Sequence, residues 1–122
     1  MNNRTIVVLL WIAMSVAQAR GEVNDFACGP LRNAYGPYDF RSDKDKLSIV
    51  EGAHLTPDVA NLVKGATGAI GGDLDYTLRA IPNHPVALMA MVRLGAKEKS
   101  AKPRGAHYTV ECYLYRANRF RN

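Results

Sequence analysis

The sequence predicts a small, mainly α-helical domain of antiparallel helix pairs with an extended N-terminal segment. Pro57 and Pro85 each follow a residue suited to capping a helix, and proline favours the first helical position. Apolar residues recur at three- and four-residue spacing in 74–81 and in 110–120, which is the period of a helix with one buried face. Apolar residues make up 48% of the chain, an ordinary share for a folded domain rather than a disordered one.

Residues 1–19 have the parts of a secretory signal. Arg4 lies in a short polar start, an apolar run covers 5–16, and small residues stand at Ala17 and Ala19. The apolar run is shorter than the ~20 residues that cross a bilayer, and an uncleaved membrane anchor is the alternative. Cleavage of the 122-residue chain would leave 103 residues, which excludes a two-domain enzyme. We therefore expect a periplasmic or secreted protein.

Export changes the meaning of the two cysteines, Cys28 and Cys112. Thiols can pair in an oxidising compartment. A Cys28–Cys112 bond would tie the N-terminal segment to the last helix, and closing so long a loop would stabilise the fold by ~4 kcal/mol. Two separately buried thiols are the alternative. The wide spacing, without a Cys-x-x-Cys motif, does not support a zinc site.

Residues 20–55 are predicted to form an extended, ordered segment rich in turns and aromatic residues. Gly29-Pro30 and Gly36-Pro37 are turn dipeptides. We interpret 44–46 as a charged turn and 47–55 as a short strand or an extended connector. The aromatic side chains would pin the segment against helices, with an exposed binding strip as the alternative use; they are Phe26, Tyr35, Tyr38 and Phe40.

The rest of the chain, 56–122, is predicted to be helical and to form one domain with 20–55. Thr56 caps a two-turn helix that ends at Gly65, and Asp73 caps a second helix that ends at Pro82. The second helix has one apolar face, formed by Leu74, Leu78 and Ile81.

Two further helices complete the predicted domain. Asn83 or His84 caps a helix that runs to Gly95 and is apolar nearly all round, as suits the central helix of a small bundle. A basic loop at 97–105 leads to a last helix over 108–120, which carries an apolar stripe formed by Val110, Tyr113, Leu114, Ala117 and Phe120.

The stretch DLDYTLRAIPNHPVALMAM resembles the end of one tetratricopeptide repeat and the start of the next, with Pro82 as the closing proline, and ECYLYRANRF resembles a second copy. Together with CGPLRNAYGPYDFR and LSIVEGAHLTPDV, these stretches make residues 28–121 similar to exported bacterial proteins with tetratricopeptide-like repeats. The resemblance implies antiparallel helix pairs that bind proteins or peptides. About one and a half repeats are present, whereas such folds usually stack ~3 or more.

Catalytic and metal-binding patterns are not recognisable in the sequence. A Gly-x-Ser-x-Gly motif is absent, and no serine of the predicted mature chain has a neighbouring histidine. Asp73 and Asp75 stand at a helix start, where carboxylates favour the helix dipole. A three-imidazole metal site would require the fold to bring together His54, His84 and His107. We therefore expect no enzyme activity, no cofactor and no bound metal.

The charge pattern points to binding. The chain carries 16 Lys and Arg against 11 Asp and Glu, and its C-terminal third is basic. Aromatic residues do not interleave with these charges, so we expect weak contact with anionic envelope surfaces rather than nucleic acid.

The sequence thus predicts a non-enzymatic periplasmic helical-repeat module that binds an envelope protein or peptide, with a second copy of the chain as another candidate partner. The alternative is a small disulfide-linked secreted effector or inhibitor that acts through its basic surface. The candidate contact residues are Tyr76, Tyr113, Tyr115, Lys97, Lys99 and Lys102.

Overall fold

The computed structural model describes residues 23–120, so the predicted signal segment 1–19 lies outside the described residues. Within 23–120 all regular structure is helical, which confirms the mainly α prediction. None of the described helices is long and apolar enough to cross a membrane. The helices are α2 (Asp25–Cys28), α3 (Lys44–His54), α4 (Pro57–Ala60), α5 (Ile70–Ala80), α6 (Pro85–Glu98) and α7 (Val110–Phe120).

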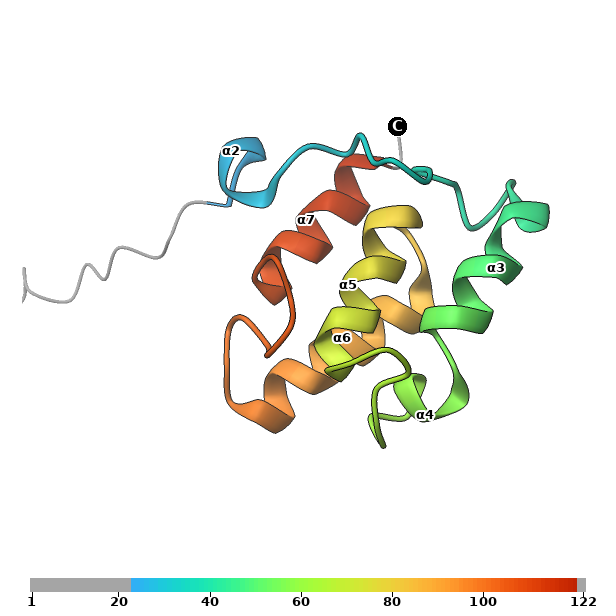
Figure 1. Ribbon diagram of the computed structural model, residues 1–122. Coiled ribbons are helices and arrows are strands. Elements are labelled where there is room, and N and C mark those ends of the chain that lie inside the picture. The colour runs from blue at the N-terminus through green and yellow to red at the C-terminus, as the bar shows by residue number, and fades with distance from the viewer. Residues whose placement is uncertain (1–22, 121–122) are drawn as a thin grey trace, which may run out of the picture.

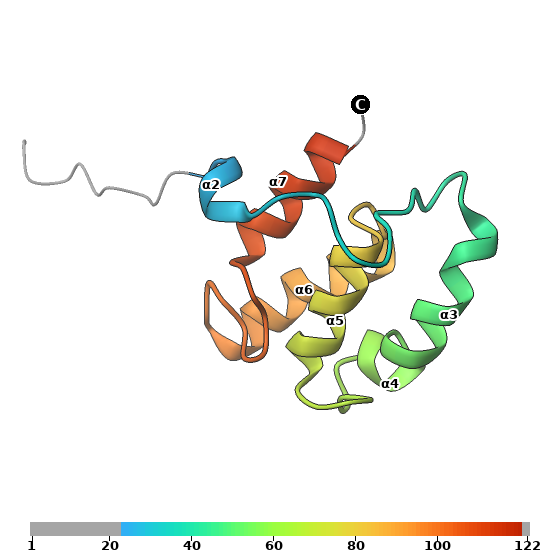
Figure 2. The same ribbon diagram turned by 45° about the horizontal axis from the view of Figure 1, so that its top comes forward.

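Helices α5 and α6 form the centre of the fold, with α3 on one side and α7 on the other (Figures 1 and 2). Helices α6 and α7 run antiparallel. A Cβ on Gly95, near the end of α6, would lie 2.8 Å from Val110 at the start of α7. At the opposite end of the pair, Pro85 and Ala117 line the same hollow.

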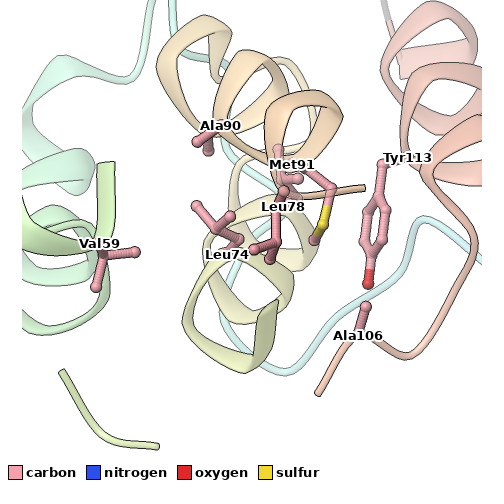
Figure 3. Packing of buried hydrophobic residues seen from close by; sticks show 9 residues of the cluster. Val59, Leu74, Leu78, Ala90, Met91, Ala106 and Tyr113 are labelled. Atoms are coloured by element: carbon pink, nitrogen blue, oxygen red, sulfur yellow. The ribbon is translucent and has the colours of Figure 1, made fainter. Parts of the chain in front are cut away.

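One hydrophobic core joins α4, α5, α6 and α7 (Figure 3). Leu74 and Leu78 of α5 pack with Met91 of α6, and the ring of Tyr113 closes the core from the α7 side. Val59 of α4 contributes from the other end. All five side chains are buried almost completely, and this shared burial supplies the main hydrophobic stabilisation of the helical region.

The predicted helix starts at Pro57 and Pro85 are confirmed. The hydroxyl of Thr56 accepts the backbone N–H of Val59 at 3.3 Å. His84, rather than Asn83, caps α6, since its Nδ1 lies 3.4 Å from the backbone nitrogen of Ala87.

Three predicted helix boundaries are wrong. Helix α4 ends at Ala60 rather than Gly65, and α5 begins at Ile70 rather than Asp73. Helix α6 continues through Gly95, where a Cβ would lie 2.8 Å from the Val110 side chain at the start of α7. It ends instead at Glu98, and the following C-cap residue, Lys99, has a left-handed backbone with φ 51°.

The charged turn and the strand or connector predicted for 44–55 are replaced by one helix, α3. Leu47 and Val50 lie one turn apart on α3, and both are buried against Ala80 and Ile81. This tertiary burial stabilises a helix that carries only two buried residues. Within the described part of 20–55, residues 25–28 and 44–54 are helical, and 29–43 has no regular secondary structure.

The segment 29–43 crosses the molecule from α2 to α3 (Figures 1 and 2). Its backbone is fixed to the turn after α5: Tyr38 donates its N–H to the carbonyl of Ala80 at 2.8 Å, and Phe40 donates to the side chain of Asn83 at 3.0 Å. Three of its aromatic rings pack against the small core formed by α3 and the end of α5. This packing confirms the interpretation for Tyr35, Tyr38 and Phe40. Phe26 differs, since it is 99% exposed.

A disulfide between Cys28 and Cys112 joins α2 to α7 across 84 residues of sequence, as the pairing hypothesis predicts. The buried Arg116 reinforces this junction, because its Nη1 donates to the carbonyl oxygens of Cys28 and Pro30. Gly29 has φ +73°, and a Cβ there would lie 2.2 Å from the hydroxyl of Tyr108. Glycine is therefore required where the segment leaves the disulfide.

A candidate binding groove

A hollow of about 730 Å³ lies between α2, the second half of α6, the connection 99–109 and the start of α7. We call it the α6–α7 groove. Its volume falls within the range of about 300–1,000 Å³ that is usual for ligand sites. The lining is mainly apolar, and the polar side chains that reach it come from Ser100, Lys102, His107, Thr109 and Glu111.

An exposed apolar stripe runs along α6 into this groove. Val86, Met89 and Val92 follow one another at three-residue spacing, and they are 49%, 52% and 38% exposed. Val92 also lines the groove. Leu114 on the neighbouring α7 is 46% exposed. Exposed large apolar side chains gathered on neighbouring elements are typical of interaction sites.

The connection that forms one wall of the groove is packed directly on the start of α5. A Cβ on Gly71 would lie 2.2 Å from the carbonyl oxygen of Arg104, and the Gly105 backbone lies against Gly72 in the same way. Only glycine permits so close an approach between a helix and another backbone. Gly71 on the helix and Gly105 on the connection therefore allow the wall to lie this close to α5.

The buried carboxylate of Asp75 fixes the next part of that wall. Its Oδ1 accepts the hydroxyl of Tyr113 at 2.5 Å. Its Oδ2 lies 2.7 Å from Nδ1 of His107 and accepts Nε of Arg79 at 2.9 Å. The Tyr113 hydroxyl in turn accepts the backbone N–H groups of His107 and Tyr108. A single carboxylate thus ties 107–108 to α5 and α7.

The Tyr113 phenol keeps its proton in this network. Burial, followed by the hydrogen bond to Asp75, raises the pKa of the Tyr113 phenol well above its usual range. The phenol therefore remains a donor at all physiological pH values. The hydrogen bonds that link Tyr113 to Asp75 and to 107–108 are therefore kept over that pH range.

The second buried aspartate, Asp73, holds a different loop. It accepts the hydroxyl of Thr67, two backbone N–H groups at Ala66 and Thr67, and a contact from Nδ1 of His54 at 2.9 Å. Burial acts to raise the pKa of Asp73, but the hydrogen bonds from Thr67 and His54 outweigh burial and lower it. Asp73 thus fixes the turn before α5 and lies apart from the groove lining.

The three histidines are each paired with a different carboxylate. His54 contacts Asp73, His84 contacts Glu51, and His107 contacts Asp75. Each imidazole thus has a structural partner on a neighbouring element. In the part of the chain that the structure describes, no three His, Cys, Asp or Glu side chains lie close enough to hold a metal ion.

The tyrosines predicted to contact a partner do not form a shared surface. Tyr113 is only 1% exposed, so its assignment as a contact residue is wrong; its ring is needed in the core and its hydroxyl is bound to Asp75. Tyr76 is half-buried and stacks on His54 at 3.9 Å between ring centroids. Tyr115 donates its hydroxyl to Asp25.

Of the three predicted lysines, only Lys102 is among the groove-lining residues of the described chain. Lys97 reaches the carbonyl of Leu62 at 3.2 Å, and Lys99 is the C-cap residue of α6. The apolar lining, including Val92, was not predicted as a site, because an almost entirely apolar helix favours burial on every side.

Three comparisons with known proteins found no match: no protein-family model, no curated protein and no solved structure is significantly similar to this chain.

Proposed function

We propose that the chain is a non-enzymatic helical module of the bacterial periplasm that binds another protein or a peptide in the α6–α7 groove. The observation that carries this proposal is the exposed stripe of Val86, Met89 and Val92 leading into an apolar hollow. Burial of such side chains in a partner interface contributes roughly 25 cal/mol for each Å² removed from water. A rigid wall favours this use, because a preformed site loses little conformational entropy on binding.

The tetratricopeptide-like pairing of helices belongs to the same proposal. Antiparallel α6 and α7 and the Pro82 turn between α5 and α6 support it. The Cys28–Cys112 disulfide supports the proposed envelope location, since disulfides persist in oxidising compartments.

A second candidate function is that of a secreted effector or inhibitor acting through its basic surface alone. The charge of the C-terminal part favours it: residues 86–120 carry seven Lys or Arg and two Glu. The two candidates differ in what the apolar stripe does, because an electrostatic effector would not depend on Val92.

Affinity capture from an envelope fraction tests the proposal. The full chain, secreted and processed by its host, would be compared with Val92→Asp and with Ile49→Asp as the matched control. Both valine and isoleucine are exposed apolar residues within helices, but Ile49 is on α3 and lies outside the groove lining. We expect a stoichiometric partner that is lost with Val92→Asp and kept with Ile49→Asp. Equal retention by both variants would contradict the proposal.

A further inference from the structure

We propose that the occupant of the α6–α7 groove is an acidic, apolar segment of another protein, whose apolar side chains enter the hollow while its Asp and Glu side chains contact the surrounding cations. This inference rests on the proposed function and adds the chemistry of the partner. It depends on how charge and apolar surface are distributed over the described residues.

Charge divides sharply along the chain. Residues 23–85 carry six Lys or Arg and eight Asp or Glu, whereas residues 86–120 carry seven Lys or Arg and two Glu. The groove is built mainly from the second part. Five exposed cations lie on α6 and on the connection to α7: Arg93, Lys97, Lys99, Lys102 and Arg104.

The acidic residues of this region do little to neutralise those cations. Glu98 accepts the backbone N–H of Arg104 at 2.9 Å, so part of its hydrogen-bonding capacity is already used. Glu111 is the one carboxylate among the groove-lining residues. Lys102 balances Glu111 within the lining, so the excess of positive charge lies beside the groove, on residues of the connection such as Lys99 and Arg104. Such a flanking charge speeds association with an anionic partner and selects against basic partners.

Exposed apolar side chains concentrate on the elements that form the groove. Of the seven large hydrophobic residues that are exposed in the described chain, Phe26, Val86, Met89, Val92 and Leu114 belong to α2, α6 and α7. The remaining two, Ile49 and Val63, lie elsewhere. Exposed apolar side chains and exposed cations thus both occur on α6 and on the elements next to it. This combination is the one that an acidic segment with apolar anchors would complement.

Other anionic surfaces fit this combination less well. A nucleic acid would neutralise the cations, but its sugar–phosphate backbone would leave the apolar lining in contact with water. A bilayer surface is broad, whereas this apolar lining is recessed in a hollow between four segments. A peptide segment can satisfy both features, because its side chains reach into the hollow and its carboxylates remain at the rim.

Selection from a random peptide library displayed on phage tests the chemistry of the occupant. The bait is the mature chain with its disulfide intact, and each selected peptide is then measured against three variants. The first is Val92→Asp, which places a charge in the groove. The second is Lys102→Glu with Arg104→Glu, and the third is the matched charge reversal Lys44→Glu with Lys46→Glu on α3.

We expect the selected peptides to combine apolar residues with Asp or Glu. Their affinity should be lost with Val92→Asp, fall roughly three- to tenfold at low salt with the Lys102/Arg104 reversal, and stay unchanged with the Lys44/Lys46 reversal. Neutral or basic peptides that still depend on Val92 would overturn the inference and leave the proposed function intact. A library that yields no Val92-dependent peptide would overturn both.

Two parallel measurements test the alternative occupants of the groove, a second copy of the chain and a membrane surface. Sedimentation of the chain alone would show a dimer that Val92→Asp dissociates if a second copy fills the groove. Flotation with vesicles of anionic phospholipid would show Lys102- and Arg104-dependent binding if a membrane surface is the partner. Either result, in the absence of acidic peptides from the selection, would overturn the inference.

Discussion

The Nδ1 atom of His107 lies 2.7 Å from the Oδ2 atom of Asp75, and this contact joins the rim of the groove to the buried side of α5. Asp75 is 1% exposed, whereas the His107 side chain is 63% exposed. The same carboxylate holds the hydroxyl of Tyr113 in the core. The shape of the groove therefore depends on a residue that no ligand could touch.

Replacing Asp75 by Asn tests this dependence. The substitution removes the carboxylate charge that faces the Tyr113 hydroxyl, the Arg79 guanidinium and the His107 ring. We expect it to lower the free energy of unfolding by about 2–4 kcal/mol. Asp58→Asn is the control, because Asp58 forms only an exposed pair with Lys64 at 3.8 Å and should change stability by about 0.5 kcal/mol or less. Urea denaturation measures both. Equal effects of the two substitutions would show that the Asp75 network does not hold the fold.

Stability should depend on pH through Asp73. Because folding lowers the pKa of Asp73, the charged form stabilises the folded state above the ordinary aspartate pKa of about 3.9, and this contribution is lost as the pH falls through the folded value. The stability difference between the wild type and Asp73→Asn should be largest near neutral pH and shrink below about pH 4. Denaturation at a series of pH values measures it. A stability difference that grows as the pH falls would contradict a lowered pKa of Asp73 in the folded state.

Gly71 should be intolerant of a side chain. A Cβ there would meet the Arg104 carbonyl at 2.2 Å, so Gly71→Ala must displace the groove wall and should destabilise the protein by roughly 1–3 kcal/mol. Gly52 of α3 is the matched control, since a Cβ there meets nothing within 4 Å. Gly52→Ala should be neutral or stabilising by up to about 1 kcal/mol. Thermal unfolding of the two variants decides, and a harmless Gly71→Ala would contradict the packing of the wall.

The disulfide should carry a large part of the stability. Replacing Cys28 and Cys112 together by Ala removes a link that spans 84 residues and should cost about 4 kcal/mol. Non-reducing peptide mapping of protein expressed in the periplasm should find the two cysteine peptides linked, and reduction should lower the melting temperature. Full thiol labelling of never-reduced protein would rule the bond out.

Local signals in the sequence identified much of the fold. The cap-and-proline pairs at Pro57 and Pro85 depend on neighbouring residues only, and both predicted starts are confirmed. Helix α3 was not predicted because its two buried residues, Leu47 and Val50, are buried by Ala80 and Ile81, which lie about 30 positions further along the chain. A pattern so weak does not separate a helix from a connector.

The groove itself was beyond prediction from the sequence. Its wall depends on the approach of Gly71 to Arg104 and on the contact of Asp75 with His107, which join residues about 30 positions apart. Local spacing carries no information on such pairs. The basic character of 97–105 was recognised, and Lys102 does line the groove. Tyr113 was misplaced because its apolar ring and polar tip fit an interface as well as a core.

Site-specific photo-crosslinking tests the central claim, that the α6–α7 groove is a protein-binding site, most directly. A photoreactive amino acid would replace Val92 in one variant and Ile49 in another, and both would be irradiated in cells that express the protein. We predict a discrete adduct from position 92 whose partner peptide is rich in apolar and acidic residues, and none from position 49. Adducts of equal yield from both positions, or none from position 92, would contradict the account.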